Sequence, residues 1–281
     1  MKTIRIIPRL DIKGPNLVKG IHLEGLRVLG KPADFAKYYY ENGADELMFM
    51  DVVASLYERN SLHDIISETA KQKFIPITVG GGIRSISDIK EVLRVGADKV
   101  CLNTAVIKNP DLIKTSSRKF GSSTIVVAIE AIKEENGKYL AYTDNGREYT
   151  GLDVFDWARK IDELGAGEIG ITSVDKEGTG EGFDHELISK ISKIVSIPVI
   201  AHGGAGKQQD VVELIKEDMV DAVMISSLFH YDFIKKIESK ASTKEGNVEF
   251  LNKKRNFHTF NPCSINELKN TLVSNKIECR V

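Results

Sequence analysis

Short runs of apolar and β-branched residues recur along the chain and alternate with longer stretches of helical periodicity. The stretches between the runs, such as SISDIKEVLRVG, often open on a Ser or Asp cap and close on Gly. Near-continuous apolar strands that alternate with helices predict a parallel sheet covered by helices, and eight repeats favour closure into a (β/α)₈ TIM barrel. The eight runs are RIIPRLDI, ELMFMDVV, PITVGG, KVCLNT, IVVAIEAI, EIGITSV, PVIAHGG and AVMISSLF.

The chain also resembles itself at an interval of about 120 residues. Asp11 and Glu130 end two strand-like runs at this spacing, the glycine turn at Gly80 has a counterpart at Gly203, and Asn103 has one at Ser226. These matches predict a single barrel over residues 1–281 with approximate half-barrel repeats at 1–120 and 121–240. Extra sequence at 234–263 reads as an insertion before a C-terminal helix.

Composition narrows the functional classes. The 281 residues are 42% hydrophobic, enough for a sizeable core, and the net charge of −1 argues against a general nucleic-acid or membrane-surface binder. Three cysteines without a CxxC pair indicate neither a disulfide framework nor a zinc site. We therefore expect a cytoplasmic protein that acts on small molecules, with no metal or cofactor.

In a barrel of this kind, residues at the carboxyl ends of the strands share one face. Two glycine-rich turns there, VGGGIRS and HGGAGK, expose backbone N–H groups that can approach an anion closely. An ordinary tight connection is the alternative for either turn alone, but their matching positions favour two phosphate sites. The predicted phosphate and substrate residues are Gly82, Asn103, Thr104, Thr172, Glu177, Gly178, Gly203, Gly204, Ser226 and Ser227.

Asp11 and Glu130 are the candidate catalytic acids. A carboxylate on either side of a bound substrate can take a proton from one atom and return a proton to another. The alternative is that each acid caps a neighbouring element or pairs with a lysine. Their equivalent places in the repeat favour catalysis.

Long motifs then resemble the HisF family, the cyclase subunits of imidazole glycerol phosphate synthase. They include RLDIK at 9–13, TVGGGIR at 78–84, GADKVCLNTA at 96–105 and GAGEIGITSVDKEGT at 165–179. The resemblance implies a barrel that receives ammonia from a HisH-type glutaminase docked at its bottom. It also implies that this ammonia cleaves and cyclises a bis-phosphorylated aminoimidazole carboxamide ribonucleotide at the top, with Asp11 and Lys19 as functional residues. Glu130 stands where the family has a second aspartate.

Four charged residues, Arg5, Glu46, Lys99 and Glu168, each begin a strand where a packed barrel would normally place an apolar residue. From the residues alone, a structural ion cluster is the preferred interpretation. The family resemblance implies instead a gate through which ammonia enters the barrel, and it places the neighbouring Asp98 at the glutaminase contact.

Departures from the family pattern suggest a narrower role. Glu130 for aspartate, His202 for serine and GPN at 14–16 resemble a group of HisF-like paralogues associated with acetamidino sugars of surface polysaccharides. Such a protein would pass ammonia to a separate sugar amidotransferase. Two further alternatives are a non-catalytic conduit that activates a glutaminase and a related sugar-phosphate isomerase.

Overall fold

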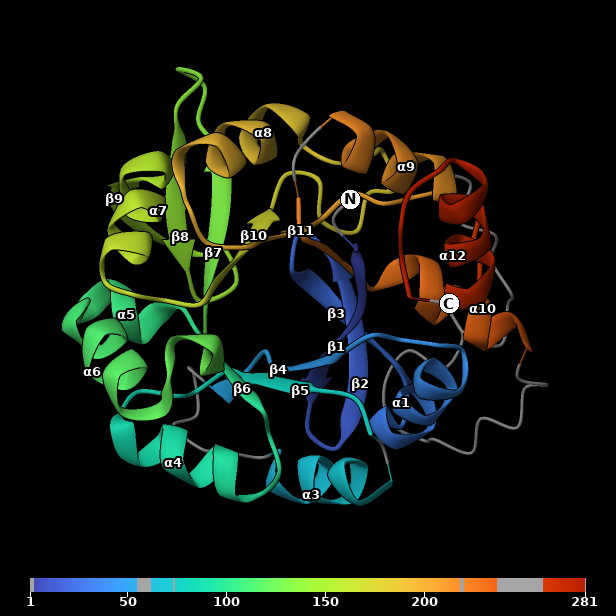
Figure 1. Ribbon diagram of the computed structural model, residues 1–281, viewed down its shortest axis with the longest axis horizontal. Coiled ribbons are helices and arrows are strands. Elements are labelled where there is room, and N and C mark those ends of the chain that lie inside the picture. The colour runs from blue at the N-terminus through green and yellow to red at the C-terminus, as the bar shows by residue number, and fades with distance from the viewer. Residues whose placement is uncertain (1–2, 55–61, 73, 218–219, 237–259, 281) are drawn as a thin grey trace.

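The structure is a computed structural model (Figure 1). In the part of the chain that it describes, eight parallel strands close into a barrel. The described residues are 3–54, 62–72, 74–217, 220–236 and 260–280. Each strand pairs with the next, and the last pairs with the first, so the predicted barrel is confirmed. In order around the barrel the strands are β1 (Arg5–Lys13), β4 (Leu47–Asp51), β5 (Ile77–Gly80), β6 (Lys99–Leu102), β7 (Ile125–Lys133), β10 (Glu168–Ser173), β11 (Val199–His202) and β12 (Ala222–Ile225).

Helices surround the barrel and cover its outer face. Capping side chains fix several helix starts. Ser85 and Asp88 form a reciprocal capping box at the start of α4 (Ile86–Arg94), and Asp153 accepts hydrogen bonds from two backbone N–H groups at the start of α7 (Val154–Glu163). The described helices are α1 (Pro32–Glu41), α3 (His63–Gln72), α4 (Ile86–Arg94), α5 (Thr104–Lys108), α6 (Asp111–Phe120), α7 (Val154–Glu163), α8 (His185–Ile194), α9 (Gln208–Glu217), α10 (Ser227–Lys236) and α12 (Ile265–Ser274), with a 3₁₀ turn at Ser122–Thr124.

Strand alternation divides the apolar residues between two cores. Along β1, Ile6 and Leu10 face outward into the large core beneath the helices, whereas Ile7 joins a smaller cluster inside the barrel. This inner cluster forms an apolar layer between charged residues below and polar residues above. Its members are Ile7, Met48, Cys101, Val126, Ile200, Ala222 and Met224.

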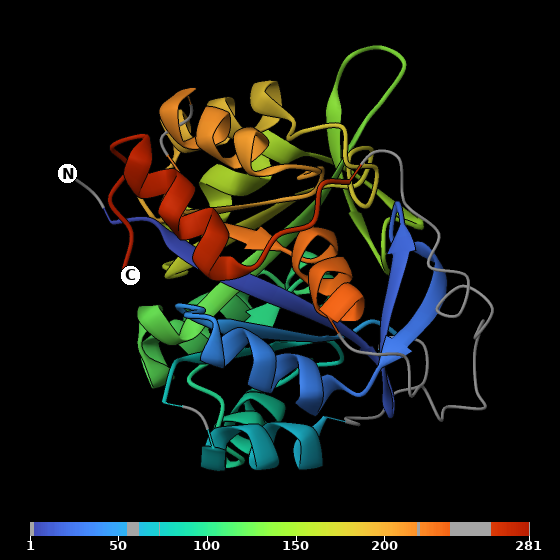
Figure 2. The same ribbon diagram turned by 90° about the vertical axis from the view of Figure 1, so that its right-hand side faces the viewer.

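Two antiparallel hairpins extend the barrel at the carboxyl ends of its strands. One comprises β2 (Asn16–Ile21) and β3 (Glu24–Gly30) and continues β1, and the other comprises β8 (Tyr139–Thr143) and β9 (Glu148–Asp153) and continues β7. Figure 2 shows both hairpins at the end of the barrel opposite the chain termini. Their matching places agree with the predicted half-barrel repeat, which itself stays a prediction.

The C-terminal segment is tied to the bottom of the barrel. Lys269 of α12 is buried and donates to Asp45 Oδ1 at 2.8 Å, and Ile4 forms a parallel bridge with Cys279. Most of the predicted insertion at 234–263 lies outside the described residues, which resume at 260 before α12. Among the described residues, no helix has the length and apolar character needed to cross a membrane.

Candidate functional site

The two predicted catalytic acids lie on opposite strands of the barrel mouth. Asp11 is near the carboxyl end of β1 and Glu130 near that of β7, with three strands between them in either direction around the barrel. Both side chains are buried. Asp11 Oδ1 accepts a hydrogen bond of 2.7 Å from Arg9 Nε, and Glu130 Oε2 accepts one of 2.8 Å from the Gly146 backbone N–H. The arrangement allows a substrate at the mouth to meet one acid on each side.

Glu130 has the protonation behaviour of an acid–base group. Burial raises its pKa to about 7, although the Gly146 N–H, Arg9 and Asn103 oppose the rise by stabilising the ionised form. A carboxyl with this pKa is populated in both forms near neutral pH, so it can donate or accept a proton there.

Arg9 is a mouth residue that the sequence analysis missed. Its side chain is buried, pairs with Asp11 and approaches His202 Nδ1 to 3.4 Å through Nη1. The signal was present, because residues 5, 7, 9 and 11 of a strand share one face, and that face also carries Arg5 and Asp11. The result is a buried cation at the mouth. Burial opposes the charge of Arg9, but Asp11, Glu177 and Glu130 outweigh it and raise the pKa of Arg9.

Lys19 ties the first hairpin to the loop that follows β10. Its ammonium forms a buried ion pair with Glu177, and the Leu23 N–H donates to the other Glu177 oxygen at 3.0 Å. Burial opposes ionisation of Glu177, but Lys19 and the Leu23 N–H outweigh it and lower the pKa of this carboxyl. The Glu177 carboxylate, predicted as a substrate contact, is thus occupied by protein groups, and the catalytic role of Lys19 stays a prediction.

The second glycine-rich turn encloses a pocket, which we call the mouth pocket. Gly203 and Gly204 have φ values of 99° and 109°, and a Cβ on Gly204 would lie 2.0 Å from the Gly182 carbonyl oxygen. Glycine therefore lets two chain segments, the loop after β10 and the turn after β11, approach each other closely here. The mouth pocket brings together predicted residues from these segments with the start of α10, and its lining includes Gly178, His202, Gly203, Gly204, Ser226 and Ser227.

The residues of the first predicted phosphate turn lie at the ends of adjacent strands. Gly82, with φ of 71°, follows β5, and Asn103 and Thr104 follow β6 at the start of α5. The buried Asn103 Oδ1 has no partner among the described residues, which leaves an acceptor beside Glu130. Thr172, in contrast, is turned toward His202, with Oγ1 3.1 Å from Nδ1.

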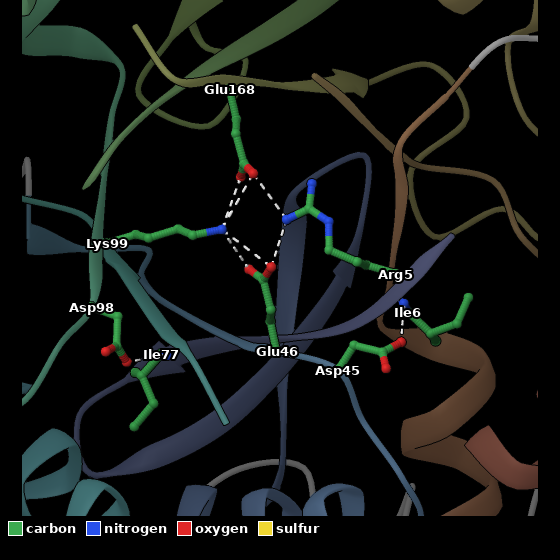
Figure 3. A network of polar contacts seen from close by, with 8 residues as sticks. All are labelled: Arg5, Ile6, Asp45, Glu46, Ile77, Asp98, Lys99 and Glu168. Carbon is green, nitrogen blue, oxygen red and sulfur yellow. Dashed lines mark hydrogen bonds and ion pairs between the residues drawn. The ribbon is translucent and has the colours of Figure 1, made fainter. Parts of the chain in front are cut away.

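The four charged residues at the other end of the barrel form a closed network, which we call the charged ring (Figure 3). Arg5 lies 2.5 Å from Glu46 and 2.9 Å from Glu168, and Lys99 lies 3.0 Å from Glu46 and 3.2 Å from Glu168. Every cation contacts both anions. Burial disfavours the charge of Arg5, but Glu168 and Glu46 reverse this and raise its pKa.

Neighbouring aspartates tie the strands beside the charged ring. Asp98, predicted at a partner contact, accepts a hydrogen bond of 2.8 Å from the Ile77 N–H, and Asp45 accepts one of 2.7 Å from the Ile6 N–H. Asp98 therefore has a structural contact whether or not a partner binds. Within the described ranges, no group of three or more His, Cys, Asp or Glu side chains could hold a metal ion.

Comparison with known proteins identifies the family. The family described as "Histidine biosynthesis protein" matches residues 5–235. Subunits named imidazole glycerol phosphate synthase subunit HisF are 59% identical over 210 residues in Legionella pneumophila (75% of this chain, 99% of the relative), 49% identical over 232 in Lactococcus lactis (82% and 90%) and 46% identical over 256 in Prochlorococcus marinus (90% and 97%). Matches of this extent show that the chain belongs to the HisF family of imidazole glycerol phosphate synthase cyclase subunits.

Proposed function

We propose that this HisF-family chain receives ammonia at the charged ring, passes it through the barrel and uses it at the mouth. The reaction is cleavage and cyclisation of a bis-phosphorylated aminoimidazole carboxamide ribonucleotide. One observation carries the proposal: two opposed acids and a ring of four charges occupy the two ends of the same barrel interior.

The layer between the two ends supports transfer of the neutral molecule. The inner apolar cluster separates the charged ring from the mouth. An ammonium ion would lose its hydration there at a large free-energy cost, whereas neutral ammonia would lose much less. The nitrogen would thus reach the mouth in its nucleophilic form.

The mouth residues divide the reaction between them. Asp11 and Glu130 transfer protons on opposite sides of the substrate, and the pKa of about 7 lets Glu130 act in both directions. The mouth pocket binds one phosphate through Gly178, Gly203, Gly204, Ser226 and Ser227. The turn with Gly82, Asn103 and Thr104 binds the other, while Lys19 contributes from the first hairpin.

The proposed partner is a HisH-type glutaminase that covers the charged ring. Arg5 and Lys99 are only partly buried, with side-chain exposures of 25% and 15%, so the ring is accessible from the bottom of the barrel. Water access of this kind would let a docked enzyme deliver ammonia directly to the ring.

Turnover of the aminoimidazole substrate with ammonium salts tests the cyclase assignment. We expect product formation by the wild-type chain and its loss in Asp11→Asn, because that change removes the carboxylate without altering side-chain size. Glutamine should replace ammonium only after a HisH-type glutaminase is added. Failure of the wild-type chain to consume the substrate with excess ammonium would refute the cyclase assignment.

A second candidate keeps the glutaminase but changes the acceptor. Glu130 is one methylene longer than aspartate and lies beside the buried Arg9, and misplacement by about 1 Å can lower a rate about a hundredfold. This favours delivery of ammonia to a sugar amidotransferase, with the chain as conduit. Two results together would support this conduit role. The wild-type chain would not cyclise the aminoimidazole substrate, and the Asp11→Asn, Glu130→Gln double variant would still stimulate the glutaminase. The remaining alternative, a sugar-phosphate isomerase, is less favoured because such an enzyme would have no use for the charged ring.

A further inference from the structure

We propose that His202 is an additional anion-binding residue of the mouth pocket, and that Arg9 is the positioning residue that holds the His202 proton on Nε2. The inference rests on the proposed function, because it adds a hydrogen-bond donor to the pocket assigned there to a phosphate. It concerns two residues of this chain that the proposed reaction has not used.

The surroundings of Nδ1 determine the tautomer of His202. Arg9 Nη1 lies 3.4 Å from Nδ1, and Thr172 Oγ1 lies 3.1 Å from it. A guanidinium can only donate hydrogen bonds, so Nδ1 must act as the acceptor. An imidazole nitrogen that accepts carries no proton, and the ring proton therefore lies on Nε2.

Nε2 is the atom left to serve the mouth pocket. His202 is only 3% exposed, yet it lines the pocket beside Gly203 and Ser226. In the described part of the chain Nε2 has no hydrogen-bond acceptor. It is also not sealed away from the surface as the unpaired buried atoms of the protein are. Because Arg9 and Thr172 occupy the Nδ1 side of the ring, Nε2–H is the donor that remains for a ligand in the pocket that His202 lines.

Arg9 is itself fixed at both ends. Its Nε donates to Asp11 Oδ1 at 2.7 Å, and its backbone carbonyl accepts from Ser226 Oγ at 3.2 Å. The guanidinium therefore cannot leave His202 without breaking the pair with Asp11. One side chain connects a catalytic acid to a wall of the mouth pocket.

The same environment keeps His202 neutral. Burial, followed by the nearby charges of Arg9 and Lys19, holds its pKa well below the ordinary value. A neutral imidazole with an accepting Nδ1 can offer the pocket only a donor, unlike a hydroxyl, which can also accept. The matching ligand chemistry is an oxygen of a phosphate or phosphate monoester.

Nitrogen-15 NMR of the full 281-residue chain, titrated with inorganic phosphate, tests both parts. We expect His202 as the Nε2–H tautomer and a change in its Nε2 signal on phosphate binding. His202→Leu should weaken phosphate binding about tenfold, whereas His202→Gln, which keeps a donor near the Nε2 position, should stay within about threefold. Equal affinity of the wild type and His202→Leu would overturn the binding role.

Two further variants test the positioning role of Arg9. Arg9→Lys keeps the charge but loses the guanidinium fork, so His202 should show a mixture of tautomers. Thr172→Val removes the other donor and should leave the Nε2–H tautomer in place. A proton on Nδ1 in the wild type, or an unchanged tautomer in a folded Arg9→Lys variant, would overturn this role. These experiments measure phosphate binding and tautomers, not turnover. Failure of the cyclase assignment would therefore leave their results unchanged, and failure of the His202 proposal would leave the cyclase assignment unchanged.

Discussion

Glu130 shows how burial can shift the pKa of one carboxyl at the expense of stability. Folding removes its carboxyl from water, and the hydrogen bond from Gly146 replaces only part of the lost hydration. The ionised form is consequently less favourable in the folded chain than in the unfolded chain. The burial that raises the pKa of Glu130 therefore lowers the stability of the folded chain wherever the carboxyl is ionised.

Glu130→Gln should stabilise the protein in a pH-dependent way. The pKa of Glu130 rises from 4.5 to about 7 on folding, so its contribution to stability is present below pH 4.5 and is lost as pH rises through 7. The Gln side chain stays neutral at every pH. The free energy of unfolding of the variant should therefore exceed that of wild type by near zero at pH 4.5 and by about 3 kcal/mol above pH 7. Urea denaturation at several pH values measures this difference. The exposed Glu135→Gln variant is the control, and an advantage for Glu130→Gln that does not change with pH would contradict the prediction.

At this scale the sequence predicted the acids but not their environment. Asp11 and Glu130 could be found because each ends a strand-like run at the repeat spacing. Arg9 follows from strand alternation once the inner face is known. The contact of Arg9 with His202 spans 193 residues of sequence, and its partner atoms depend on how the strands stagger around the barrel.

At the scale of elements, buried ion pairs connect segments that are distant in sequence. Lys19 in the first hairpin pairs with Glu177 in the loop after β10, and Lys269 in α12 pairs with Asp45 before β4. Neither pair has a local sequence signal, because 158 and 224 residues separate the partners. A buried ion pair contributes little net stability, but removal of one member leaves an uncompensated charge.

Glu177→Gln should loosen the first hairpin. The change leaves the buried ammonium of Lys19 without an anionic partner, so opening of β2 and β3 should become easier. We expect amide hydrogen exchange of the hairpin to accelerate about tenfold or more, as measured by mass spectrometry. Glu24→Gln, which breaks the exposed pair of the same hairpin with Arg147, should change exchange little. Equal exchange in wild type and Glu177→Gln would show that Glu177 does not hold the hairpin.

Lys269→Met should destabilise the attachment of α12. Lys269 also donates to the carbonyls of Gly43 and Arg280, so its loss leaves Asp45 and two carbonyls without their shared donor. We expect a loss of about 3 kcal/mol in the free energy of unfolding. Lys276→Met on the exposed end of the same segment should stay within about 0.5 kcal/mol of wild type. Chemical denaturation compares the two, and similar values for both would contradict the role of the buried pair.

At the scale of the whole molecule, the sequence predicted the barrel because each strand and helix carries its own periodicity and caps. Ile7 and Met48 fill the interior at the level that strand alternation requires, and Arg5 and Lys99 fall one level below. The hairpins after β1 and β7 were not predicted, since their pairing depends on tertiary contacts with those strands. The molecule thus has a polar mouth, an apolar middle layer and a charged lower end.

This division predicts that the charged ring affects the supply of nitrogen more than its use. In Lys99→Met, Glu46 and Glu168 share only Arg5, so the ring gains net negative charge and rearranges at the bottom of the barrel. In complex with a HisH-type glutaminase, glutamine-dependent turnover should fall about tenfold relative to ammonium-dependent turnover, a change of about 1.4 kcal/mol in the barrier. Under the proposed route, ammonia supplied from solution enters at the mouth and does not cross the ring. Lys114→Met on the exposed face of α6 is the matched control, and an equal fall in both turnover rates would place the effect of Lys99 in the chemistry at the mouth instead.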